Sequence, residues 1–207
     1  MREVIHHWWI LALRSLLALT LAMAIFLLQA WVKFSFLDAV TVPFLIVMLS
    51  AYGILDSLLL LFLGFQFAPH SPARTISFTQ GMCGAAIGVL MVTVFFRPAE
   101  IEWFVYIITA QAAATGIFEF LSGLRFTSHI RDEWACFATG VASIGFAVLL
   151  QTSYNGTTRR ALDWFLAYAL LLFASMGWFS FRLFVLNRQH RHLRHDDAAS
   201  HATATKS

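Results

Sequence analysis

The sequence predicts an all-α integral membrane protein with six transmembrane helices, and two observations predict this class. Hydrophobic residues make up 59% of the 207 positions and charged residues only 12%, whereas soluble domains hold about 45 to 50% and about 25%. Apolar stretches are also spread along the whole chain, and the mean hydropathy is +0.73. Because too little polar surface remains to cover a water-soluble globule, lipid must surround most of the side chains.

Six stretches are long enough to cross the hydrocarbon core of a bilayer, which takes about 20 helical residues. The first of them is too long for the apolar part of a secretory signal. The expected spans are residues 8–28, 40–65, 76–96, 103–124, 134–150 and 162–186. The short connections predict that sequence neighbours pack as antiparallel helices. Residues 187–207 would form a basic, His-rich tail.

Lysine and arginine are unevenly divided between the two faces that six spans would create. Nine lie on the face that carries both termini, and four lie on the opposite face. The larger group is Arg2, Arg74, Arg125, Arg131, Arg182, Arg188, Arg191, Arg194 and Lys206; the smaller group is Lys33, Arg97, Arg159 and Arg160. By the positive-inside rule, both termini are expected to face the cytoplasm.

An internal repeat is visible when each pair of spans is laid over the next. The segment Ala51–Asp56 in the second span aligns with Ala114–Glu119 in the fourth at an offset of 63 residues. Both segments place a carboxylate three residues after a glycine, and Gly177 falls 61 residues beyond Gly116. The pattern predicts three antiparallel helical hairpins of about sixty residues each.

Two motifs resemble the HdeD family of bacterial acid-resistance membrane proteins. One is the opening Trp-containing helix with a basic residue, Trp8–Arg14, and the other is the small-Tyr-small-aliphatic-aliphatic-Asp pattern of Ala51–Asp56. The stretches 134–150 and 164–177 also fit the repeating unit of that family. The resemblance covers most of the chain, and it implies a bacterial inner-membrane protein with a role in acid stress. It implies no established reaction.

The chain departs from the family at two points. The family often has glycine directly after the basic residue and again after the Asp, whereas Ser15 and Ser57 stand there in this sequence. The fold is unaffected by these departures, but a tight helix contact at either position is put in doubt.

Three ionisable side chains lie furthest inside apolar spans, namely Arg14, Asp56 and Glu119. Each is costly there, at about 2.5 to 3.5 kcal/mol near a helix centre. Because Arg14 and Asp56 lie at similar depths on neighbouring antiparallel helices, we expect them to form an ion pair. Snorkelling of Arg14 to the interface and a proton-relay role are the alternatives. For Glu119, either an ion pair, locally with Arg125 or between helices, or a proton-sensing role is open.

The third span carries Gly81, Gly84 and Gly88, which include a small-xxx-small step that lets two helix backbones approach closely. The sequence leaves open whether the partner helix belongs to the same chain or to a second copy. A homo-oligomer is therefore one possibility.

No catalytic, haem or metal signature is recognised, so we expect a protein without enzymatic activity or cofactor. Haem held between membrane helices needs axial ligands within the spans. All eight histidines instead lie in ends, loops or the tail: His6, His7, His70, His129, His190, His192, His195 and His201. The chief alternative is a small transporter or channel for protons or small solutes, lined by the three charged residues. The scarcity of other polar residues in the spans weighs against it.

The basic tail is expected to be attracted to anionic lipid headgroups, and the modest net charge of +3 gives no reason to expect a nucleic-acid partner. A solvated topology anchor, metal binding and pH-dependent docking to lipid through its histidines are the alternatives for its role.

Overall fold

The computed structural model describes residues 8–31, 38–68, 70–95, 101–126, 134–153 and 158–204. Within these residues the secondary structure consists of six α-helices and no strand, which confirms the predicted all-α class. The helices are α2 (Trp8–Trp31), α3 (Asp38–Gln66), α4 (Pro72–Phe95), α5 (Ile101–Phe126), α6 (Trp134–Ser153) and α7 (Thr158–Ala204).

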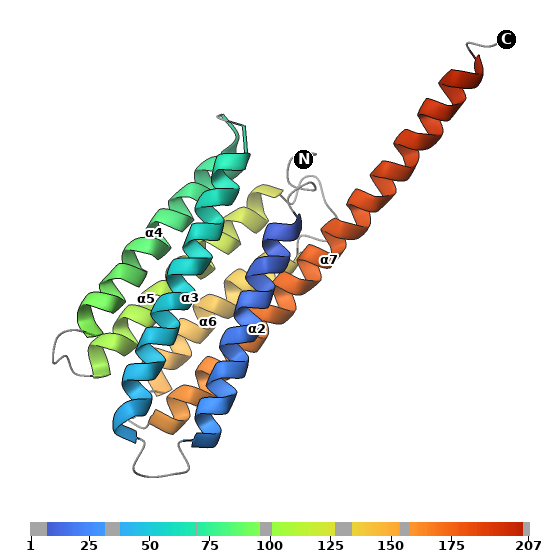
Figure 1. Ribbon diagram of the computed structural model, residues 1–207. Coiled ribbons are helices and arrows are strands. Elements are labelled where there is room, and N and C mark those ends of the chain that lie inside the picture. Colours follow the sequence, from blue (N-terminus) through green and yellow to red (C-terminus); the bar gives the residue numbers. More distant parts are fainter. Residues whose placement is uncertain are drawn as a thin grey trace.

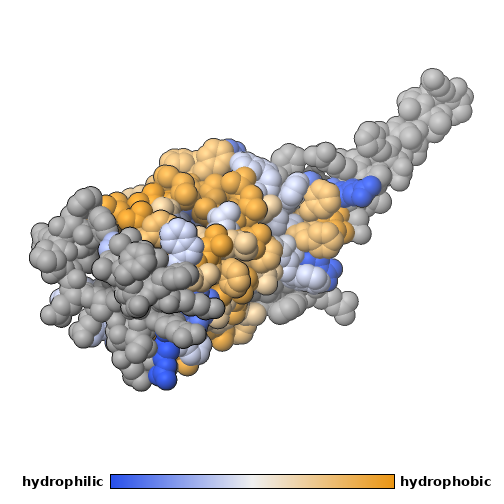
Figure 2. All heavy atoms as spheres, turned by 60° about the horizontal axis from the view of Figure 1, so that its bottom comes forward, coloured by the Kyte–Doolittle hydropathy of each residue, from blue (hydrophilic) through white to orange (hydrophobic). Residues whose placement is uncertain are grey.

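Five of these helices are long and apolar enough to cross a membrane. They contain the segments Trp8–Trp31, Pro43–Gln66, Pro72–Thr93, Val105–Gly123 and Leu162–Arg188. The apolar part of α6 is shorter, Phe137–Thr152. Many large apolar side chains are exposed on the outside of the bundle, for example Leu16, Phe26 and Val89, and Figure 2 shows orange areas on one of its faces. Such a surface suits lipid rather than water, so these features fit a multi-pass membrane protein.

The helices form a closed ring in the order of the sequence. Each helix contacts the one before it and the one after it, and α7 closes the ring by packing against α2. Successive helices run in opposite directions, with α2, α3 and α4 in front of α5, α6 and α7 in the view of Figure 1. The start of α2 and the outward extension of α7 therefore lie at the same end of the bundle.

The most extensive helix contacts join α3 with α4, α5 with α6, and α2 with α7. These pairs are displaced by one helix from the hairpins that the sequence repeat predicts, because α2 packs more extensively on α7 than on α3. Polar contacts hold α2 and α7 together near both ends of the pair. Ser180 Oγ donates to the Trp8 carbonyl at 3.0 Å, and Gln29 Nε2 donates to Asp163 Oδ1 at 3.0 Å.

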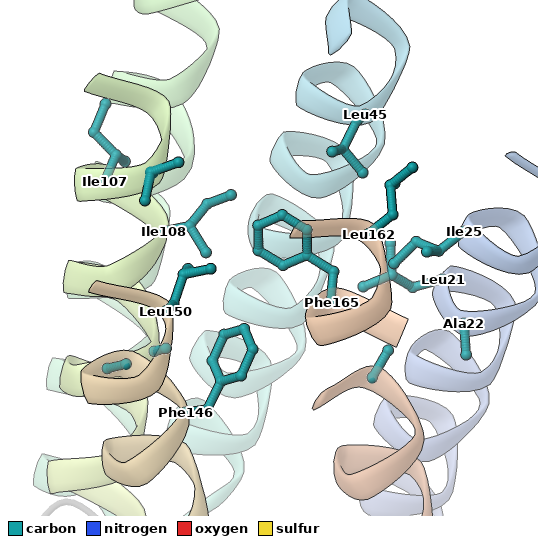
Figure 3. Packing of buried hydrophobic residues seen from close by; sticks show 14 of the residues in the cluster. Leu21, Ala22, Ile25, Leu45, Ile107, Ile108, Phe146, Leu150, Leu162 and Phe165 are labelled. Atoms are coloured by element: carbon teal, nitrogen blue, oxygen red, sulfur yellow. The ribbon is translucent and has the colours of Figure 1, made fainter. Parts of the chain in front are cut away.

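The main hydrophobic core lies in the half of the bundle away from the start of α2. All six helices contribute to it, through buried residues such as Ile25 and Leu45, with Met91, Ile108, Phe146 and Phe165. Figure 3 shows labelled members of this cluster, among them Ile25, Leu45 and Phe165, converging from the surrounding helices into the interior. A smaller cluster around Ile10, Leu63 and Phe67 fills the opposite end. The two clusters leave a middle layer in which the charged residues lie.

Helix ends differ from the expected spans in two informative places. Helix α4 begins at Pro72, four residues before the expected start, because proline suits the first helical position and the Ser71 carbonyl accepts from the Arg74 amide at 3.1 Å. Helix α7 continues from the membrane segment through Ala204. Most of the predicted tail is therefore helical in its backbone.

Candidate functional site

Arg14 is the centre of a buried charge cluster. It lies on α2 with only 2% of its surface exposed, and its guanidinium faces Asp56 of α3. Arg14 Nε donates to Asp56 Oδ1 at 2.6 Å, and Nη2 donates to Oδ2 at 3.0 Å. This two-point contact is the strong, fork-like geometry of arginine and carboxylate. The ion pair expected from the sequence is therefore present, and Arg14 does not snorkel.

Glu119 joins the same cluster from the other side of the ring. Arg14 Nη1 donates to Glu119 Oε1 at 3.5 Å, and Gln80 Nε2 of α4 donates to the same oxygen at 3.4 Å. Both contacts are long for hydrogen bonds, so Glu119 is held more loosely than Asp56. Glu119 therefore forms an ion pair between helices, which is one of the alternatives that the sequence left open, and Arg14 is its cationic partner. The side chain of Arg125 lies outside the described residues.

The cluster connects helices that are not ring neighbours. Arg14 lies on α2 and Glu119 on α5, which are separated around the ring by α3 and α4. The side chains of Asp56 and Glu119 are only 14% and 13% exposed. Arg14 lies about 9 Å along the helix from Trp8 at 1.5 Å per residue. A buried charge network at this depth fixes the position of three helices relative to one another.

Several polar side chains that the sequence analysis passed over extend this layer. Tyr168 of α7 donates its hydroxyl to Ser143 Oγ of α6 at 3.2 Å, and its ring stacks on Phe146 with centroids 4.2 Å apart. Gln80 is buried beside Glu119. The sequence does contain a sign of this polar layer, because Gln80 and Gln111 place side-chain amides inside apolar spans. The polar set is therefore larger than the three charged residues that the sequence analysis named.

Two cavities meet at this layer. The larger has a volume of about 50 Å³ and the smaller about 10 Å³, and both are lined by Asp56, Gln111 and Thr115. Along α3 the larger extends from Leu49 to Asp56, and the smaller continues to Leu60. The larger cavity is lined by residues of α2, α3, α4, α5 and α7, so it lies inside the ring, whereas the smaller is lined by α3, α4 and α5 only and lies to one side of it. We call the two together the central chamber.

The three glycines of α4 all pack against α3 of the same chain. A Cβ added to Gly81 would meet the Leu61 amide nitrogen at 2.9 Å, and one added to Gly88 would meet the Ile54 side chain at 2.8 Å. A Cβ added to Gly84 would meet Ser57 Oγ. This face of α4 is therefore covered by α3, and it is not free for a second copy of the chain.

The two serines that depart from the family pattern both lie at close helix contacts. Ser15 donates its hydroxyl to the Phe173 carbonyl at 3.1 Å, and it lies opposite Gly177 on α7. Ser57 donates to the Gly53 carbonyl at 2.6 Å and lies opposite Gly84. Close helix contacts are therefore present at both positions, although the sequence put them in doubt. In each case the facing helix supplies the glycine that makes room.

The expectations for the histidines and for the basic tail concern side chains that mostly lie outside the described residues. The side chains of His6, His7, His129 and of the tail beyond Arg188 are not described. Among the residues that were described, no group of three or more His, Cys, Asp or Glu side chains is placed to hold a metal ion.

Comparisons with family models, with curated proteins and with solved structures found no match to this chain.

Proposed function

We propose that the chain is a non-enzymatic, six-span protein of the bacterial inner membrane, with both termini in the cytoplasm and a role in tolerance of acid or envelope stress. The resemblance of Trp8–Arg14 and Ala51–Asp56 to HdeD-type proteins motivates the role. The observation that carries the proposal is the Arg14 cluster, because these two motifs supply the residues that meet in it. That both motifs contribute a side chain to one buried contact supports the proposal.

The proposal of six spans requires α6 to cross the membrane in addition to the five helices that are long and apolar enough to do so. At 20 residues it is about 30 Å long, which equals the hydrocarbon thickness. It lies against α5 from Phe137, which faces Gly123, to Ile144, which faces Gly116. Since α5 carries a candidate span, a helix packed along it in the ring is expected to cross the same layer.

Reporter fusions test the six-span topology. Fusions ending after residue 155 should place the reporter outside the cytoplasm, and fusions ending after residue 188 should place it inside. A fusion ending after residue 128 is the reference and should be cytoplasmic. If the fusions after residues 128 and 155 report the same compartment, α6 does not cross and the topology must be redrawn.

Survival of a deletion strain at graded external pH tests the proposed role. The strain should survive acid less well than its parent, and the wild-type gene should restore survival. Asp56→Asn should restore it poorly, because it weakens the cluster. Asp163→Asn is the matched control. It changes an exposed carboxylate near the start of α7, and the amide oxygen can still accept from Gln29 Nε2, so it should restore survival fully. Equal survival of the deletion strain and its parent, under acid and under envelope stress, would contradict the role.

A small transporter or channel is the second candidate, and the central chamber is the observation that favours it. Its larger cavity lies inside the ring, and Asp56, Gln111 and Thr115 line it, so a polar path would pass there. Purified protein in liposomes should then pass protons or small solutes, and Asp56→Asn should abolish the flux. The absence of flux from liposomes with correctly folded protein would remove this candidate.

We also propose that the basic tail binds anionic headgroups. Arg191 and Arg194 follow the membrane segment Leu162–Arg188 within two helical turns, in a helix whose backbone continues through Ala204. Each cation near an anionic surface contributes about 1 kcal/mol. A tail peptide should therefore bind anionic vesicles and not neutral ones, and equal binding to both would contradict this.

A further inference from the structure

The ring consists of three extensively packed helix pairs, α3 with α4, α5 with α6, and α2 with α7, and of three smaller contacts between these pairs. We call the smaller contacts, α2/α3, α4/α5 and α6/α7, the seams. Backbone packing inside a pair leaves no room for a methyl group. A Cβ added to Gly64 of α3 would meet the Phe78 amide nitrogen of α4 at 3.2 Å. One added to Gly140 of α6 would meet the Phe120 amide nitrogen of α5 at 2.6 Å. Because such close-packed surfaces separate only with the loss of many contacts, each pair is a rigid unit.

Two of the seams are joined firmly in the middle layer of the bundle. Arg14 and Asp56 join α2 to α3 through contacts of 2.6 and 3.0 Å. Tyr168 joins α7 to α6 through its 3.2 Å hydrogen bond to Ser143, and its ring also stacks on Phe146. An ion pair with two contacts holds the first of these seams, and a hydrogen bond together with a ring contact holds the second.

The polar link that is described across the α4/α5 seam is weaker. Gln80 Nε2 of α4 donates to Glu119 Oε1 of α5 at 3.4 Å, which is long for a hydrogen bond. The same oxygen accepts from Arg14 Nη1 at 3.5 Å, so Glu119 keeps its cationic partner when Gln80 moves away. Separating α4 from α5 therefore leaves no buried charge without a partner, whereas separating Arg14 from Asp56 would do so.

The smaller cavity of the central chamber lies at this same seam. Its volume is about 10 Å³, and its lining includes Gln80 and Cys83 of α4 and Ala114 and Phe118 of α5. Side chains that border a cavity have no partner atoms on that side, so fewer contacts are lost when the two walls separate. The weak polar link and the gap in the packing therefore coincide at the α4/α5 seam.

We propose that the α4/α5 seam opens and closes as a lateral gate, with the Gln80–Glu119 contact as its latch. The pairs α3/α4 and α5/α6 move apart as rigid units, and the smaller cavity beside Asp56 then becomes accessible from the lipid phase. Rigid-body movement of packed helices is an established form of conformational change. The gate follows from the construction of the ring, so it goes beyond the proposed function and does not depend on it.

Distances between two spin labels, measured by pulsed electron paramagnetic resonance on the full-length protein in lipid vesicles, test the gate. Cys83 and Cys136 would first be replaced by alanine, so that labels attach only at introduced cysteines. Met82 of α4 and Ile117 of α5 are 53% and 51% exposed, so labels at these positions span the seam from the outside without disturbing the packing. We call them the seam labels.

Two further label pairs report on distances inside the rigid units. Leu58 of α3 with Met82 of α4 is the first, and Ile117 of α5 with Val141 of α6 is the second. All four residues face outward. Because the units are rigid, both of these distances should stay unchanged in every variant.

Gln80→Leu removes the latch. It should raise the ratio of the longer to the shorter distance between the seam labels by about tenfold, which is the effect of losing a hydrogen bond to a charged group. Gln80→Lys instead places a second cation against Glu119 and should lower this ratio below the wild-type value. A general loosening of the bundle would not make the two variants act in opposite directions.

Gln29→Leu is the matched control, because it removes a contact between a glutamine and a carboxylate inside the α2/α7 pair. Its seam-label distances should equal those of the wild type. Seam-label distances that do not respond to Gln80→Leu would overturn the gate. An equal change inside the α3/α4 or α5/α6 pair would also overturn it, since the units would not be rigid. So would a rise in the ratio for Gln80→Lys, or a response to Gln29→Leu as large as that to Gln80→Leu.

Discussion

Arg14 of α2 and Asp56 of α3 meet through two parallel N–H···O contacts of 2.6 and 3.0 Å. The guanidinium also reaches Glu119 of α5, at 3.5 Å. One arginine therefore holds two carboxylates with unequal strength, inside a bundle whose surface is apolar. This inequality makes the cluster testable by graded substitution.

Arg14→Met should be the most destabilising of three single changes in the cluster. It leaves two carboxylates without their cation, and breaking a buried ion pair by removing one partner costs about 3 to 5 kcal/mol. Asp56→Asn should cost less, because Glu119 still faces Arg14. Glu119→Gln should cost about 1 kcal/mol or less, since the closer pair survives. The free energy of unfolding in detergent measures the order, and a Glu119→Gln variant less stable than Arg14→Met would contradict it.

Gly140→Ala should destabilise the protein, whereas Gly145→Ala on the same helix should not. A Cβ at Gly140 would lie 2.6 Å from the Phe120 amide nitrogen and 2.8 Å from the Gly116 carbonyl oxygen, so α5 and α6 must separate. A Cβ at Gly145 meets nothing within 4 Å. Forcing a methyl group into a packed contact costs about 1 to 3 kcal/mol. Tm values of the two variants check this, and equal values would show that α5 and α6 are not packed as described.

Tyr168→Phe should cost about 1 kcal/mol, because it removes the hydrogen bond to Ser143 and keeps the ring stacked on Phe146. Tyr168→Ala should cost about 3 to 5 kcal/mol, because it also removes the ring and leaves a cavity. Chemical unfolding of both variants measures the difference. Similar losses for the two would mean that the ring contributes little to the packing of α6 against α7.

Ser15→Leu should separate α2 from α7 and lower Tm by several degrees. Ser15 is 5% exposed and lies opposite Gly177, so a larger side chain has no room there. Leu16→Ala is the control, because Leu16 is the next residue and is 57% exposed to the outside of the bundle. A Tm for Ser15→Leu equal to that of Leu16→Ala would show that the ring is not closed by this contact.

The Arg14–Asp56 pair could be predicted from the sequence, because the two residues lie at similar depths in the membrane. Arg14 and Asp56 are opposite charges at similar distances from the ends of adjacent antiparallel helices, so their contact follows from the helical rise. The Arg14–Glu119 contact was not specifically predicted, because it joins helices that are far apart in the sequence. The spacing of residues along one helix does not show which helices meet across a ring.

The packing of the helices was less predictable than their existence. Apolar length identifies a span, whereas the choice of the closest neighbour depends on small residues on facing surfaces. Gly177 opposite Ser15 favours the contact of α7 with α2, and the glycines of α4 favour α3. Each of these contacts depends on residues of two helices at once. The sequence repeat shows only which segments are alike, and so it predicted helix pairs that differ by one helix from the pairs with the most extensive contacts.

A double-mutant cycle of Arg14→Met and Asp56→Asn tests most directly whether the buried charge cluster holds the helices together. The free energy of unfolding would be measured for the wild type, both single variants and the double variant in the same detergent. We expect a coupling energy of at least about 1 kcal/mol, because the second change removes a charge that the first has already left unpaired. Strictly additive losses would show that the two side chains do not interact, and they would contradict the account.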